Sequence, residues 1–370
     1  MPDTARGLKP IQEFNLSDAE TVKLILNGES AVDWHRLNLQ DEAQAREMLE
    51  AQEFRPDEPS DRARLERVKN EAISYLRRHL DFPIPNPVER ASVEELLLLA
   101  SGKGHRQVCA CTILKAMHIV HHVDGQELLF TIPMSIQDVF KLVEEKVYRV
   151  IGDMLSAGYP ITEFIGGRKN KDSLYTKLLS KAETVAAAVY DRLRFRIVTR
   201  TADDILPIVL YLSRRVFPFN QVIPGQSLNT LFRLRRYFLS FDNLLPLMPQ
   251  FQLGLTDDLT HTANAFSGRS FRAVHFVADV PVRLPNEAME AAPPNAWVLG
   301  PVVSVLSEFQ LVDRETEAIN EQGDGSHAAY KHRQRLAVMR RLKLGTRTGR
   351  PGAASAPLAR SEARSRKRPV

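Results

Sequence analysis

VVSVLSEFQLVD, at residues 302–313, is rich in valine and other apolar residues and alternates polar and apolar side chains over 308–311, which predicts a β-strand. LRFRIVT (193–199) alternates in the same way, and FRAVHFVADVPV (271–282) is a further clear strand candidate. Helical patterns separate the strands along the chain, as in SIQDVFKLVEEKVYRVIGDMLSAG (135–158). The sequence therefore predicts an α+β fold in which helices flank a mixed β-sheet.

Glu308 and Gln310 share one face of the 302–313 strand, because side chains alternate along a strand. Glutamate is depleted in strand interiors, so Glu308 needs a physical reason to be there. A metal ion, a role as a base or an ion pair would each supply that reason. If Glu308 instead lies exposed on an edge strand, no such reason is needed. The sequence leaves open whether Glu308 is a functional or paired residue inside the sheet or an exposed residue at its edge.

The first 130 residues are expected to form a mostly helical N-terminal region. DRARLERVKNEAISYLRRHL (61–80) has an apolar stripe among charged residues, which is typical of an amphipathic helix. QVCACTILKAMHIVHHV (107–123) predicts a largely buried helix. His118 and His122 share a face of it, and a buried helix with a histidine-rich edge is favoured over a metal site.

Residues 131–335 are expected to form the second region. A leucine-rich stretch at about 225–262 has few strand signals and predicts a helical insertion. Residues 336–370 are expected to form a basic tail, and from about residue 345 the composition is that of a disordered segment.

The net charge of +5 over 370 residues is unevenly distributed. Arg340–Val370 contains ten Lys/Arg and one Glu, which leaves −4 for residues 1–339. Nucleic-acid contact through a basic surface is therefore expected of the tail, which could bind RNA, and not of the folded body.

Cys109 and Cys111 are too close together to staple a fold, which favours a reducing compartment. No apolar run approaches the roughly 18 residues of a membrane-spanning helix, and MPDTARGLKPIQEF lacks the apolar segment of a secretory signal. We therefore expect a cytoplasmic protein with no membrane partner.

GGRKNKDSLYTK (166–177) places two glycines and a basic turn before a helix expected to begin near Ser173. Arg168 and Lys169 bring positive charge to the helix N-terminus, where backbone N–H groups already favour an anion. Lys177 lies one turn after Ser173 on the same face. The stretch predicts a phosphate-binding turn, and a solvated basic turn with a serine N-cap is the simpler alternative.

Asp191 stands at the entry to the 193–199 strand, where a carboxylate is well placed to hold Mg²⁺. Arg194 and Arg196 then point to one side of this strand. The alternative is an aspartate that caps the strand or pairs with Arg194.

Phe271 and Arg272 lead into the 271–282 strand, which carries His275. An exposed aromatic ring beside an arginine can stack on a nucleobase. The alternative places Phe271 in the core and His275 on the surface of the sheet.

These segments occur in an order that resembles the synthetase domain of the RelA/SpoT alarmone family, over about residues 135–335. In that family an RxKxxxSxxxK segment binds ATP phosphates. Lys169, Ser173 and Lys177 keep its spacing, while Arg168 stands one place late and Gly167 occupies the arginine's position.

Three further segments carry the resemblance. The family's GYRSxH segment is similar to Phe271, Arg272, Ala273 and His275, and its ExQxRT strand is similar to 308–313, although Val312 and Asp313 replace the Arg-Thr pair. The family's helix ending in Tyr-Lys is similar to 326–331.

The resemblance implies a nucleotidyltransferase-like fold and transfer of pyrophosphate from ATP to the 3′-hydroxyl of GDP or GTP. Asp191 and Glu308 would be catalytic and would hold Mg²⁺. The implied sets are Arg168, Lys169, Ser173, Lys177 and Arg196 for the ATP phosphates, and Phe271, Arg272, His275 and Gln310 for the acceptor nucleotide.

Two other functions stay open at this point. The altered acceptor segment and the basic tail allow an adenine nucleotide or the 3′ end of a tRNA as acceptor. The lost Arg-Thr pair allows a catalytically inactive nucleotide-binding regulator. Retention of both candidate carboxylates argues against inactivity, because a protein that only binds nucleotide has little use for them.

Overall fold

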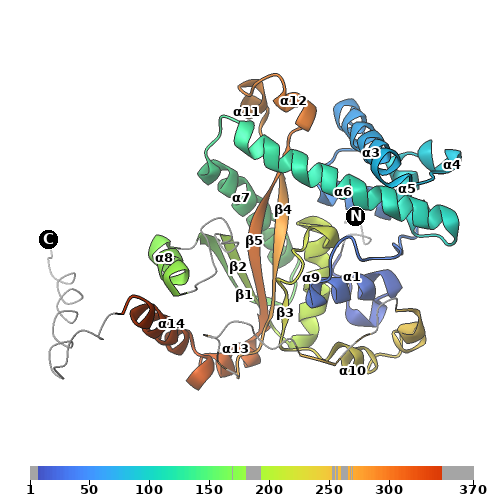
Figure 1. Ribbon diagram of the computed structural model, residues 1–370. Coiled ribbons are helices and arrows are strands. Elements are labelled where there is room, and N and C mark those ends of the chain that lie inside the picture. The colour runs from blue at the N-terminus through green and yellow to red at the C-terminus, as the bar shows by residue number, and fades with distance from the viewer. Residues whose placement is uncertain are drawn as a thin grey trace, which may run out of the picture.

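The computed structural model describes residues 7–168, 170–180, 193–251, 255, 257–259, 266, 268 and 270–343. These residues form one five-stranded sheet with the order β1-β2-β5-β4-β3 (Figure 1). Its strands are β1 (Ile161–Arg168), β2 (Leu193–Thr199), β3 (Leu228–Asn229), β4 (Val274–Arg283) and β5 (Val302–Asp313). Since β5 runs parallel to β2 and antiparallel to β4, the expected mixed sheet of an α+β fold is confirmed.

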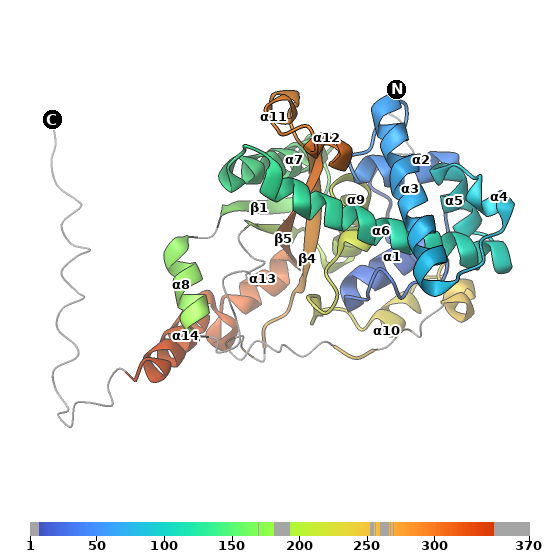
Figure 2. The same ribbon diagram turned by 45° about the horizontal axis from the view of Figure 1, so that its top comes forward.

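Helices surround this sheet on both sides (Figures 1 and 2). They are α1 (Leu16–Asn27), α2 (Glu42–Ala51), α3 (Pro59–Leu80), α4 (Asn86–Glu89), α5 (Val93–Ala100), α6 (His105–Thr131), α7 (Ile136–Ser156), α8 (Lys171–Ser180), α9 (Ile205–Arg215), α10 (Leu234–Phe238), α11 (Asn286–Glu290), α12 (Ala296–Leu299), α13 (Arg314–Asn320) and α14 (His327–Arg341). No described helix is both long and apolar enough to cross a bilayer.

One face of the sheet is an aromatic core. Phe195, Phe276 and Phe309 lie on three neighbouring strands and are fully buried, with the Phe309 ring centroid 5.4 Å from each of the other two. Tyr148 of α7 and Phe217, just after α9, contact this cluster. Close-packed aromatic burial of this kind holds the three strands in register.

The N-terminal region is helical, as expected, and has a core of its own. Buried apolar side chains of α2, α3, α5 and α6 form this second cluster. The long helix α6 then crosses the sheet (Figure 1). His122 of α6 lies 3.2 Å from the buried Asp279 of β4, so the two parts of the chain meet through a polar contact between an imidazole and a carboxylate.

The segment at 225–262 contains β3, α10 and a 3-10 helix at Leu245–Gln250, so its described residues form short helices and one very short strand. At the other end of the chain, α14 crosses the expected boundary at residue 335 and ends at Arg341. The disordered tail expected from about residue 345 lies outside the described residues.

Candidate active site

The strand register brings the polar residues of three strands together. Arg194 lies opposite Glu308, and Arg196 lies opposite Gln310 across the β2–β5 pair. On the other side of β5, His275 lies opposite Gln310. Because strand side chains alternate, these five residues share the face opposite the aromatic core. We call these five side chains the polar face.

Glu308 lies at the centre of the polar face. Its residue is 8% exposed, and Oε1 lies 2.9 Å from His275 Nε2 and 3.8 Å from Arg194 Nε. The edge-strand interpretation is excluded, because β5 is paired on both sides. An ionised carboxylate only accepts hydrogen bonds, so this contact requires a proton on Nε2 of His275.

Arg194 links the two polar residues of β5. Its guanidinium donates to Oε1 of the buried Gln310 and lies beside Glu308. Sequence analysis had Arg194 only as a partner of Asp191 and did not include it in the site. The signal was present, because Arg194 has the same alternation as Arg196.

Arg196 meets a carboxylate from the helix that follows β5. Its Nη2 lies 2.7 Å from Oε1 of Glu317 on α13, and both side chains are 18% exposed. Burial raises the pKa of Glu317, and the nearby carboxylates of Glu163 and Glu321 raise it further. The positive charge of Arg196 acts in the opposite direction and lowers it. Glu317 is a second residue of this site that sequence analysis missed.

The α8 helix packs against α14 (Figure 2). It begins at Lys171, two residues before the predicted start, because the side chain of Asn170 accepts from the Asp172 N–H at 2.8 Å. Ser173 lies in its first turn, and its Oγ accepts a hydrogen bond from Lys331 Nζ at 3.2 Å. Lys177 is half-buried one turn later.

His327, the first residue of α14, lies near three cationic side chains of α14 and β2. Burial lowers its pKa, and the cationic groups of Lys331, Arg194 and Arg196 lower it further. The Glu321 carboxylate acts in the opposite direction and raises it. The first turn of α14 therefore faces the cations of β2. Lys331 and His327 belong to the 326–331 segment that carries part of the family resemblance, yet the sequence analysis assigned neither to the site.

Arg168 does not join this group. On β1 it lies opposite Leu193, whereas Gly167 lies opposite Arg194 on the polar face. Its guanidinium contacts Glu144 at 2.8 Å and Gln137 at 2.6 Å, both on α7. A shift of one residue along a strand moves a side chain to the other face of the sheet, which is why Arg168 points away from the predicted phosphate site.

Phe271 and Arg272 lie immediately before β4, as predicted, and both are half-buried. The backbone of Arg272 is held at both polar atoms by Asn320, the last residue of α13. Oδ1 of Asn320 accepts from the Arg272 N–H at 2.9 Å, and its Nδ2 donates to the Arg272 carbonyl at 2.7 Å.

Lys169 and Asp191 lie outside the described residues, so the structure does not bear on their predicted roles. Within the described part, no group of three or more His, Cys, Asp and Glu side chains could hold a metal ion. Glu308 is the carboxylate that the polar face offers. Mg²⁺ in phosphate sites often uses one or two carboxylates together with substrate phosphates, and Glu308 fits that pattern as one ligand.

The histidines of α6 do not belong to the polar face and contact other parts of the chain. His118 Nδ1 lies 3.1 Å from Asn220 Nδ2, and His121 is buried beside Phe54 and Arg64. Burial lowers the pKa of His118 to about 4 and that of His121 to about 3. Both imidazoles are therefore neutral in the folded protein at pH 7.

No family model matches the chain, and no curated protein matches it. Among solved structures, it is similar to a GTP pyrophosphokinase family protein from Streptococcus pneumoniae, with 15% identity, 57% of this chain and 90% of that chain covered, and a TM-score of 0.29. Small alarmone synthetase 1 from Bacillus subtilis, bound to its product pppGpp, gives 14% identity, coverage of 60% and 89%, and a TM-score of 0.27. Small alarmone synthetase 2 from the same organism gives 14%, 60% and 98%, and 0.28. Identity and TM-score are low in all three.

Proposed function

We propose that this chain is a nucleotide pyrophosphokinase that transfers pyrophosphate from ATP to the 3′-hydroxyl of GDP or GTP. The observation that carries the proposal is the strand register, which gathers one buried carboxylate, one histidine and two arginines on the polar face. Phosphoryl-type transfer depends mainly on positioning and on neutralising charge, and these residue types can do both.

The donor subsite would lie between the polar face and the α8–α14 pair. Ser173, Lys177, Lys331 and Arg196 come from three elements, and the contact between Ser173 and Lys331 holds α8 and α14 together here. Burial is the main cause that lowers the pKa of His327, and Lys331, Arg194 and Arg196 lower it further, so three cationic groups act on His327 at this place. A triphosphate would neutralise that charge, and Lys169 is proposed to join the set.

Glu308 is proposed to act on the acceptor hydroxyl. Its carboxylate would accept the proton of the 3′-hydroxyl, and the hydrogen bond from His275 would hold it in place for that transfer. Glu308 would also hold Mg²⁺ with Asp191 and the phosphate oxygens, and the ion would neutralise phosphate charge.

The acceptor subsite would lie on the β4 side of Glu308. Phe271 would stack on the base, since the Asn320 clamp fixes the backbone beside it. Arg272, His275 and Gln310 would contact the ribose or phosphates. Arg168 is not included in the donor subsite, because its side chain is directed to α7.

The test offers GDP, GTP and ATP separately to the purified full chain with Mg²⁺ and labelled ATP. Mass-resolved products should show two phosphates added to a guanine nucleotide. If ATP is the one nucleotide that receives the pyrophosphate, the proposed reaction stands and the acceptor is an adenine nucleotide instead of GDP or GTP. Nucleotide binding without transfer to any acceptor would overturn the proposal in favour of a binding protein.

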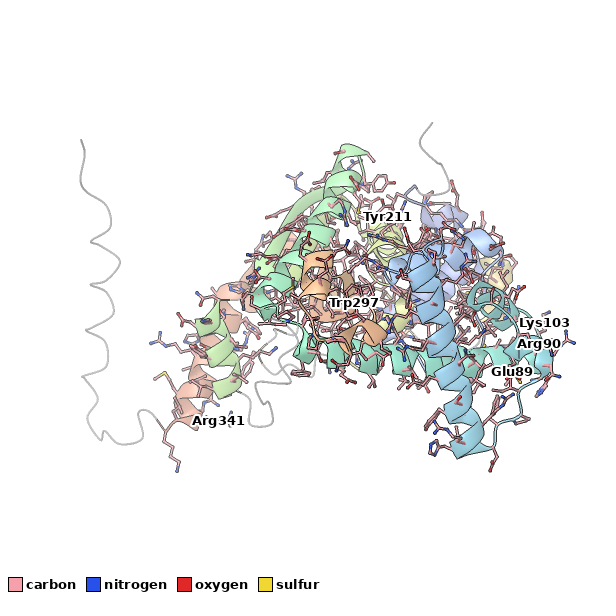
Figure 3. The ribbon with its side chains drawn as sticks, turned by 90° about the horizontal axis from the view of Figure 1, so that it is seen from above. Glu89, Arg90, Lys103, Tyr211, Trp297 and Arg341 are labelled. Carbon is pink, nitrogen blue, oxygen red and sulfur yellow. The ribbon has the colours of Figure 1, made fainter. Side chains whose placement is uncertain are left out.

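A second acceptor, RNA, is favoured by the composition of α14 and the residues beside it. Residues 326–343 contain six Lys/Arg and no Asp or Glu. Arg335 and Arg340 are exposed, and Arg341 lies at the outer end of α14 (Figure 3). An RNA acceptor would give an affinity that falls steeply with salt, through lysine and arginine contacts with phosphates. If bulk tRNA receives no label at low salt, RNA is excluded as the acceptor.

A further inference from the structure

The short helix α13 touches both halves of the proposed site. Glu317 pairs with Arg196 of the donor subsite, and Asn320 binds the backbone of Arg272 in the acceptor subsite. These two residues are three apart in one helix and therefore lie on neighbouring positions of its surface. A displacement of one carries the other with it.

Glu317 occupies a group that a phosphate would need. Carboxylates and phosphates bind the guanidinium fork in the same way, so Glu317 and a donor phosphate compete for Arg196. The Nε of Arg196 is buried and finds no hydrogen-bond acceptor among the described residues, so Glu317 leaves part of the guanidinium unsatisfied. Glu317 itself is held in a half-buried position beside Glu163 and Glu321, whose charges oppose its own.

Asn320 is the last residue of the same helix and is buried. It is 3% exposed, and it binds both the N–H and the carbonyl of Arg272. The start of α13 is fixed to the end of β5, where Asp313 Oδ1 accepts from the Thr316 N–H at 3.0 Å. After α13 the chain turns at Gly323, whose φ of +70° lies in the left-handed region. Motion of α13 would thus act on the segment that carries Phe271.

We propose that α13 couples the two subsites, with Glu317 and Asn320 as positioning residues. Glu317 holds Arg196 until a donor phosphate replaces it, and Asn320 transfers the resulting shift of α13 to Phe271 and Arg272. Donor binding therefore prepares the acceptor subsite. The coupling rests on the proposed function, because it assigns a donor phosphate to Arg196. Site–site couplings of this kind typically change affinity by about 5–150-fold.

The experiment measures the Kd of a non-transferable ATP analogue and of GDP on the full chain, each alone and with the other at saturation. In the wild type, the analogue should tighten GDP binding at least about fivefold. E317Q should bind the analogue more tightly than the wild type and should lose most of the coupling. N320A should keep the wild-type Kd for the analogue and also lose the coupling.

E315Q is the matched control, because Glu315 is an exposed carboxylate on the same helix. It should leave both Kd values and the coupling unchanged. E317Q keeps the shape of the side chain, so a folding defect in N320A would not remove the test. Thermal unfolding of each variant identifies such a defect.

The outcomes separate the two proposals. If the wild type binds both nucleotides and each Kd is independent of the other ligand, the coupling is wrong and the proposed function stands. Coupling of wild-type size in both E317Q and N320A would also overturn the role of α13. If the wild type binds neither nucleotide, the proposed function and the coupling are both wrong.

Discussion

Acidification should destabilise the chain through two histidines of α6. His118 and His121 line the interior between α6, the N-terminal helices and the segment at Phe219–Gln221. Burial is the largest cause that lowers the pKa of His118 to about 4 and that of His121 to about 3. In the unfolded chain both return to about 6.5.

The sign follows from which state binds more protons. Between the folded and unfolded pKa values, the unfolded chain takes up a proton at each histidine and the folded chain does not. The stabilisation is therefore present above about pH 6.5 and is lost as the pH falls below it. At pH 5.5 each of the two histidines has lowered the free energy of unfolding by about 1.4 kcal/mol relative to neutral pH. The pair together lowers it by about 3 kcal/mol. The neighbouring His122 acts in the opposite sense, because its hydrogen bond to Asp279 raises its pKa.

Denaturant unfolding at pH 7.5 and pH 5.5 isolates the two histidines when the wild type is compared with a His118→Gln/His121→Gln double variant. His122 and the carboxylates are common to both proteins. The wild type should lose about 3 kcal/mol more than the double variant over this pH range. Equal losses in the two proteins would refute the assignment of buried, neutral imidazoles.

Three other predictions concern the core and the site. Phe309→Ala should lower the free energy of unfolding by about 3–5 kcal/mol, because Phe309 is fully buried among aromatic rings; a loss below about 1 kcal/mol would contradict this packing. Gly166→Ala should destabilise by about 1–3 kcal/mol in the same assay, since an added Cβ would lie 2.8 Å from Tyr148 Cε1, and no change in stability would count against the tight β1–α7 contact. Lys331→Met should weaken ATP binding roughly tenfold or more by calorimetry. Arg168→Gln should leave it unchanged, and the reverse order would place the donor phosphates on the α7 side of the sheet.

Strand alternation made much of the site predictable from the sequence. It placed Glu308 and Gln310 on one face and Arg194 and Arg196 on another, and the register then joined these faces into one. His275 joins them because β4 pairs with the other side of β5. Local periodicity was sufficient here, since the side-chain period of a strand is two wherever the strand lies.

The pairing of distant segments was not predictable in this way. The sequence does not show whether position 167 or position 168 faces the site, because both lie in the same basic turn. The register of β1 against β2 decides this, and it places Gly167 opposite Arg194 and Arg168 opposite Leu193. Ser173 and Lys331 are 158 residues apart, and the contact of Glu317 with Arg196 depends on where α13 packs after β5. Such contacts follow from tertiary packing, which leaves no periodic signal in the sequence.

The most direct test of the central claim is the rate of pyrophosphate transfer in Glu308→Gln beside the wild type and Arg168→Gln. Glu308→Gln keeps the size of the side chain and removes the charge that faces His275 and Arg194. We predict at least about a 100-fold loss of kcat with a melting temperature near that of the wild type. Arg168→Gln should retain the wild-type rate. A wild-type rate in Glu308→Gln would contradict the claim that the polar face carries the reaction.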